Sequence, residues 1–106
     1  MALSHIIIGS LSKVTLFKSR VLVRLRPSVL DPAGEATSSA SRRLGVEGVS
    51  NLRIGKLIEL DIEASSKEDA IKRIELLSDR LFANPVIEDW QLEFLTDAQL
   101  NSLKES

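Results

Sequence analysis

The residue types that carry most enzyme chemistry are scarce in this chain of 106 residues. Cysteine is absent, and the only histidine is His5, near the N-terminus. Disulfides and thiolate chemistry are therefore excluded, and neither a catalytic triad nor a multi-histidine metal site is expected. The phosphate-binding pattern G-x-x-x-x-G-K-[ST] and the dinucleotide pattern G-x-G-x-x-G are also missing from the sequence. We expect no catalytic residue, no metal site and no bound cofactor on this chain.

Two charged groups remain as candidates for binding chemistry. Arg53 and Lys56 flank Gly55 and could hold a phosphate between two cations and a bent backbone, although a plain β-bulge accounts for the same residues. Three acids alternate along the segment that follows: Glu59, Asp61 and Glu63. Clustered carboxylates can bind a metal, but on a strand face they are commonly solvated or paired. Three arginines of a neighbouring strand are natural partners for them: Arg20, Arg24 and Arg26.

Composition and charge place the chain among compact single domains. Hydrophobic residues make up 43% and charged residues 27%, and 14 Lys and Arg balance 15 Asp and Glu. This balance gives no general attraction to nucleic acid or to an anionic membrane. No apolar run approaches the roughly 20 residues that span a bilayer. We therefore expect a cytoplasmic protein that binds neither nucleic acid nor membrane.

The first clear elements are a strand and a helix. In residues 20–26, Val21, Val23 and Leu25 alternate with three arginines and Leu22, which predicts a strand with one buried face. Asp31 and Pro32 then suit the N-cap and first position of a helix that ends at Gly45. Small residues recur along that helix at helical spacing: Ala33, Ala36 and Ala40. This stripe predicts a helix that packs closely against the sheet.

Residues 49–64 carry the main architectural question. Apolar residues fall on even numbers from Leu52 to Ile62, interrupted only at Lys56. One long strand bent at Gly55 keeps them on one face, whereas a hairpin at Gly55-Lys56 would place Leu52 opposite Glu59. We favour the long strand, which is roughly twice the usual length. Its overhang would leave unpaired amides, so we expect it to pair with a second copy of the chain.

A second helix and a last strand complete the pattern. Ser66 with Asp69 forms a capping box ahead of a helix that ends at Asn84-Pro85. Residues 86–95 then predict a strand with three large side chains on its buried face: Trp90, Leu92 and Phe94. Thr96 and Gln99 could cap one or two further helical turns.

The expected fold is α+β, with a small antiparallel sheet and two helices on one face. The order is β-α-β-α-β with a long bent middle strand, and it becomes ferredoxin-like if that strand splits at Gly55. We divide the chain into an N-terminal extension over residues 1–18, the α+β domain over residues 19–95 and a short tail over residues 96–106.

Three segments carry a resemblance to a known family. They are LDPAGEA at residues 30–36, VSNLRIGKLIEL at residues 49–60 and ANPVIEDW at residues 83–90. Together they strongly resemble the PurS family, the small subunit of phosphoribosylformylglycinamidine synthase. The resemblance runs from about Arg20 to Phe94, and the first 18 residues depart from it.

The resemblance implies a role in de novo purine synthesis. The family's complex converts formylglycinamide ribonucleotide, ATP and glutamine into formylglycinamidine ribonucleotide, ADP, phosphate and glutamate. PurS-like proteins form dimers and bridge a large synthetase subunit and a glutaminase subunit, which helps ammonia pass between their active sites. They have no catalytic residues of their own, and ATP and Mg²⁺ are expected on the large subunit.

Five residues are our candidates for contact with partner subunits: Arg53, Gly55, Lys56, Asn84 and Pro85. The first three combine a bend with charge, and the last two lie at a helix-to-strand corner whose exposed backbone a partner could bind. The self-associated state is a dimer or a tetramer. The alternative is an ACT-like module that senses amino acids as a dimer, for which Gly45 and Gly48 are the only glycines near the expected ligand site.

Overall fold

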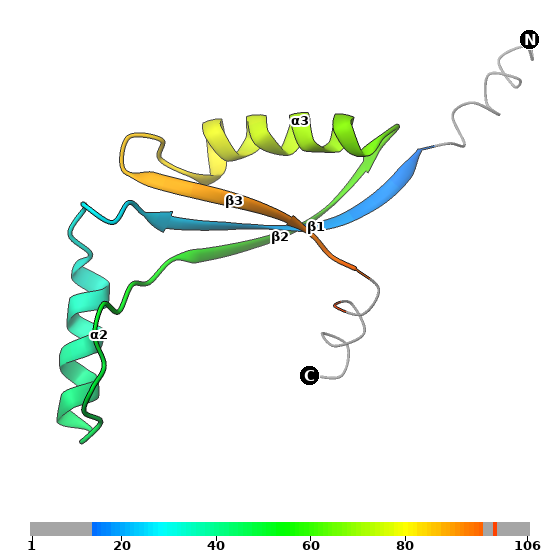
Figure 1. The fold of residues 1–106 in the computed structure, drawn as a ribbon. Helices are drawn as coiled ribbons and strands as arrows, with labels where there is room; N and C mark the ends of the chain where they lie inside the picture. The colour runs from blue at the N-terminus through cyan, green and yellow to red at the C-terminus, as the bar shows by residue number, and fades with distance from the viewer. Residues whose placement is uncertain (1–13, 97–98, 100–106) are drawn as a thin grey trace, which may run out of the picture.

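The computed structural model describes residues 14–96 and residue 99, which form one antiparallel sheet and two main helices (Figure 1). In chain order the elements are β1 (Thr15–Leu25), α2 (Pro32–Arg43), β2 (Lys56–Ala64), α3 (Lys67–Leu77), the π-helical turn η1 (Ser78–Phe82) and β3 (Glu88–Phe94). The strand order is β2-β1-β3, and both pairings are antiparallel. The α+β class and the order of elements are confirmed.

Side chains of the central strand β1 alternate between a buried and an exposed face of the sheet. Val21 and Val23 are fully buried in a core that they share with Ile62 of β2 and Ile74 of α3. The three large side chains of β3 pack against this core as predicted: Trp90, Leu92 and Phe94. The opposite face is charged.

The predicted domain boundary between residues 18 and 19 falls inside β1, which begins at Thr15. Residues 1–13 of the predicted extension lie outside the described residues, as does most of the tail over residues 96–106. Thr96 and Gln99 make the expected reciprocal capping bonds, at 2.8 and 3.2 Å.

Helix α3 lies along the apolar face of the sheet (Figure 1). Its first turn is capped by Ser66, whose hydroxyl accepts from the Asp69 amide at 3.0 Å. Ala70 and Ile74 are completely buried against the strands. The cap predicted at Ser66 is therefore confirmed, although within the described residues the Asp69 carboxylate pairs with Arg73 at 3.3 Å and makes no return bond to Ser66.

Helix α2 differs from the prediction, because it projects away from the sheet instead of lying beside α3 on the same face (Figure 1). Its ends are as expected: Asp31 caps it and Gly45 follows it with φ of +86°. Gly34 is its only buried residue, and it packs against the Leu52 backbone, where a side chain would collide with the carbonyl. The alanine stripe offers little apolar area to the sheet, and within the described residues α2 is buried only where Gly34 meets the returning segment.

The long middle strand is also a correction, because β2 begins only at Lys56. Asn51 has a φ of 55°, which interrupts an extended run, and the Ile54 amide donates to Asp31 Oδ2 at 2.8 Å instead of to a strand. No hairpin forms at Gly55 either, and the described sheet has three strands. The strand overhang expected to pair with a second copy is therefore not formed.

Candidate functional site

The five predicted contact residues all lie at one end of the sheet. There β1 ends while β2 and β3 begin, as the pairs Val23↔Lys56 and Leu25↔Glu88 show. We call this region the hinge end, because the chain leaves the sheet here for α2 and returns from it. Sequence segments more than 20 residues apart thus meet at a single surface.

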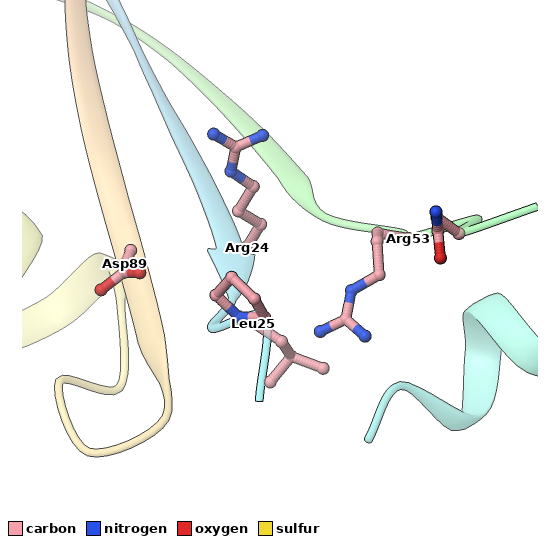
Figure 2. A pocket seen from close by; sticks show the side chains of 6 residues that line it. Arg24, Leu25, Arg53 and Asp89 are labelled. Atoms are coloured by element: carbon pink, nitrogen blue, oxygen red, sulfur yellow. The ribbon is translucent and has the colours of Figure 1, made fainter. Parts of the chain in front are cut away.

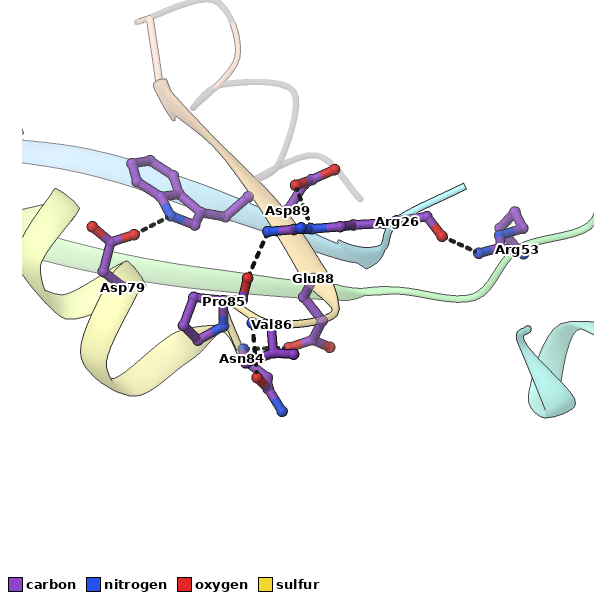
Figure 3. A network of polar contacts seen from close by, with 9 residues as sticks. Arg26, Arg53, Asp79, Asn84, Pro85, Val86, Glu88 and Asp89 are labelled. Carbon is purple, nitrogen blue, oxygen red and sulfur yellow. Dashed lines mark hydrogen bonds and ion pairs between the residues drawn. The ribbon is translucent and has the colours of Figure 1, made fainter. Parts of the chain in front are cut away.

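Arg26 ties two of these residues together, and sequence reasoning missed this role. Its carbonyl accepts from Arg53 Nη2 at 2.9 Å, while its guanidinium donates to the Pro85 carbonyl (Figure 3). The same guanidinium lies 3.3 Å from the Asp89 carboxylate. Arg53 Nη2 also donates to the Val29 carbonyl at 2.8 Å. Arg26 therefore connects the loop before α2, the segment before β2 and the turn before β3.

The turn before β3 is shaped by Asn84. Its Oδ1 accepts from the Val86 amide at 3.0 Å, and its own amide donates to Glu88 Oε1 at 2.7 Å (Figure 3). An Asx turn of this kind fixes the local backbone. The Pro85 ring and the Val86 side chain remain exposed to solvent.

Lys56 and Gly55 lie where β2 begins. Lys56 Nζ donates to the Phe82 carbonyl at 2.8 Å, which attaches the start of β2 to the end of η1. A Cβ atom at Gly55 would collide with the Val23 carbonyl, so only glycine allows the two strands to approach this closely. Both residues have a structural role here, and their contact with a partner stays a prediction.

Asp31 holds α2 and the segment before β2 together. Its two carboxylate oxygens accept from different elements: Oδ1 from the Gly34 amide at 2.9 Å and Oδ2 from the Ile54 amide at 2.8 Å. The hydrogen bond from Ile54, followed by that from Gly34, lowers the pKa of Asp31 below its usual value. The carboxylate therefore stays ionised at neutral pH and holds α2 to the segment before β2.

Two cations on the charged face of the sheet are paired, although not in the combinations predicted. Lys18 contacts Asp61 at 3.0 Å, whereas Arg20 contacts Glu93 of β3 at 2.7 Å. Because β1 is the central strand, its cations can pair with acids on either β2 or β3. Within the described residues, no three acidic or histidine side chains are grouped as a metal site requires.

Two neighbouring hollows open on this face at the hinge end, with volumes of about 480 and 310 Å³. Both are lined by Arg24 and Arg53, so we treat them as one feature, the Arg24–Arg53 trench. Arg24 projects from β1 and Arg53 from the segment before β2 (Figure 2). Leu25 and Pro27 line one hollow, and Leu22 and Gly55 line the other. Sequence reasoning placed Arg24 on this face but did not select it as a contact residue.

The hinge end is therefore suited to binding rather than to covalent chemistry. It presents guanidinium groups, exposed backbone and small apolar surfaces. Elsewhere, none of the helices in residues 14–96 is long and apolar enough to cross a membrane.

Comparison with known proteins identifies the relatives of this chain. Residues 18–96 match the PurS family, described as phosphoribosylformylglycinamidine (FGAM) synthase. The PurS subunit of this synthase from Synechocystis is 48% identical over 77 residues, which cover 73% of this chain and 77% of that protein.

Solved structures give the same result. The crystal structure of the Thermotoga maritima PurS subunit superposes with a TM-score of 0.72 at 36% identity, covering 77% of this chain and 94% of that one. A chain in the structure of PurLQS from the same organism has the same score and identity, covering 76% and 99%. The PurS resemblance seen in the three sequence segments is thus confirmed and replaces the ACT-like alternative.

Proposed function

Because the chain belongs to the PurS family and is a subunit of the ligase FGAM synthase, we propose that it acts as the non-catalytic bridge of that enzyme. In this role it joins an ATP-dependent synthetase subunit to a glutaminase subunit in purine biosynthesis. The bridge keeps the two active sites in register, so ammonia released from glutamine reaches the synthetase without loss to bulk water. A homologue in a solved PurLQS assembly is the observation that carries this proposal.

The chemistry of the chain supports a bridging role. It has no cysteine and one histidine, and its hinge end presents guanidinium and backbone groups rather than a nucleophile with a base. We therefore assign ATP and Mg²⁺ to the synthetase subunit and no cofactor to this chain. The contact surface that we propose for the two partners is the hinge end with its five predicted residues: Arg53, Gly55, Lys56, Asn84 and Pro85.

Self-association belongs to the same proposal. Helix α2 projects from the sheet with Leu44 82% exposed, and Leu30 just before it is 72% exposed. A helix of three turns is only marginally stable without tertiary contacts. A second copy of the chain would supply them, as a dimer or a tetramer. We place the assembly in the cytoplasm, where the other enzymes of a soluble biosynthetic route would meet it.

Reconstitution tests the bridging role. The chain is mixed with the synthetase and glutaminase subunits of its own organism, and glutamine-dependent formation of the amidine product is measured. We expect product only when all three proteins are present, whereas free ammonia should support the synthetase subunit without the glutaminase. Full glutamine-dependent turnover without this chain, or product formation by this chain alone, would contradict the proposal.

A further inference from the structure

Arg24 is a cation without a protein partner among the described residues, on a face where the other two cations of β1 are paired. Its neighbours along β1 are matched, since Lys18 contacts Asp61 and Arg20 contacts Glu93. Across residues 14–96, no hydrogen bond or ion pair reaches the Arg24 guanidinium, and the side chain is exposed. The ladder of charges along the central strand is therefore interrupted at the Arg24–Arg53 trench.

The residues on either side of Arg24 explain this interruption. On the β2 side the neighbour is Gly55, whose Cβ position would lie 3.2 Å from the Arg24 Cβ, and glycine offers no acceptor side chain. On the β3 side the paired residue is Asp89, but its carboxylate lies 3.3 Å from Arg26 Nε. Arg24 therefore has no partner in the described residues, because one neighbour is a glycine and the other pairs with Arg26.

Arg53 supplies a second cation that is already held in place. Its Nη2 donates to the carbonyls of Arg26 and Val29, which fixes the guanidinium. Its Nη1 and Nε have no acceptor among the described residues. An acceptor group entering the trench therefore meets one fixed and one adjustable guanidinium (Figure 2).

We infer that the Arg24–Arg53 trench binds an acidic, extended segment of a partner subunit, an inference that rests on the proposed function. Guanidinium groups form paired hydrogen bonds with carboxylates, which favours Asp or Glu side chains as the ligand groups. The two hollows share Arg24 and Arg53 and are open to solvent, whereas a site for a small phosphorylated molecule usually encloses most of its ligand. Leu22, Leu25 and Pro27 also line the hollows and suit the aliphatic parts of such a segment. Asp89 lines one hollow as well, but its carboxylate is neutralised by Arg26 at 3.3 Å.

Charge reversal at Arg24 tests this inference. The full chain carrying Arg24→Glu is titrated with the synthetase and glutaminase subunits, separately and together, and the affinities are measured by calorimetry. We expect affinity for one subunit to fall by about tenfold or more, because a like charge then faces the acidic segment. The matched control is Lys72→Glu, which makes the same change of charge on the exposed surface of α3 and should bind like the wild type.

A second variant separates binding from folding. Arg24→Gln removes the charge without adding an acid, and circular dichroism with sedimentation reports its fold and self-association. Weaker partner binding by Arg24→Gln with both properties unchanged supports the inference. Wild-type affinity of both Arg24 variants for the partner subunits overturns the inference. So does a loss of self-association with partner binding unchanged. A raised KM for the ribonucleotide with unchanged assembly would also overturn it. If the wild-type chain itself fails to assemble, the proposed function fails instead.

Discussion

At the scale of single residues, Asp31 joins two separate elements through one carboxylate. Sequence patterns identify it as a helix cap, and its Oδ1 does accept from the Gly34 amide. Its Oδ2 does something the pattern does not show, since it accepts from Ile54, 23 residues away. One carboxylate thereby joins a local cap to a long-range contact and sets where β2 can begin.

Asp31→Asn should destabilise the chain at neutral pH. Asparagine has one acceptor oxygen, so it can keep the Gly34 bond but places an amide group against the Ile54 N–H. Urea unfolding at pH 7 should therefore show a lower midpoint for the variant. Because the pKa of Asp31 is lowered in the folded state, its contribution is present above the unfolded value near 3.8 and is lost as the pH falls further.

The difference in midpoint between the two proteins should accordingly shrink in unfolding experiments below pH 4. Comparing wild type and variant at each pH cancels the titration of the other carboxyl groups. A difference that stays constant from pH 7 down to pH 3 would show that the ionised carboxylate is not the cause.

At the scale of elements, helices and strands that depend on local sequence patterns could be predicted. The alternation of Val21 and Val23 and the caps at Asp31 and Ser66 all predict elements found in the structure. The start of β2 could not be predicted, because it depends on the Asp31–Ile54 bond and on the backbone of Asn51. Even-numbered spacing continues through that segment although the sheet does not.

The position of α2 and the unpaired state of Arg24 could not be predicted either, because both depend on residues that are distant in the sequence. A stripe of alanines fits a sheet or a returning coil equally well, so periodicity cannot choose between them. Arg24 resembles Arg20 in the sequence and differs only because Gly55 and Asp89 flank it in space. Of the candidate site, the sequence predicted the region but not the residue that is left without a partner.

Helix α3 should account for much of the stability of the described domain. Ile74 is completely buried between this helix and the sheet, so Ile74→Ala should lower the free energy of unfolding by about 2–5 kcal/mol. Leu76→Ala on the same helix is the control, because Leu76 is 56% exposed and its loss should cost about 0.5 kcal/mol or less. Chemical denaturation measures both, and similar values for the two variants would show that α3 is not packed as described.

At the scale of the whole molecule, the sheet with α3 forms a packed unit and α2 does not belong to it. Within the described chain only Gly34 of α2 is buried, whereas Ala33 and Ala36 of the alanine stripe are exposed. The sequence suggested self-association through an unpaired strand, whereas the structure suggests it through the exposed surface of α2. Covering this helix with a second copy would bury apolar area that the described residues of one copy leave exposed.

A charge on the alanine stripe should therefore weaken self-association without unfolding the chain. Ala36 is exposed on that stripe, and Ala36→Glu would bring a carboxylate into an apolar contact between copies, where burial without a partner is costly. The control is Arg42→Gln, which also lowers the charge by one unit but lies outside the alanine stripe, about 120° around α2 from Ala36. Sedimentation equilibrium at micromolar concentrations should show a dimer or larger for the wild type and the control, and a shift towards monomer for Ala36→Glu. A monomeric wild type, or an Ala36→Glu protein that associates as strongly as the control, would show that α2 is not the contact between copies.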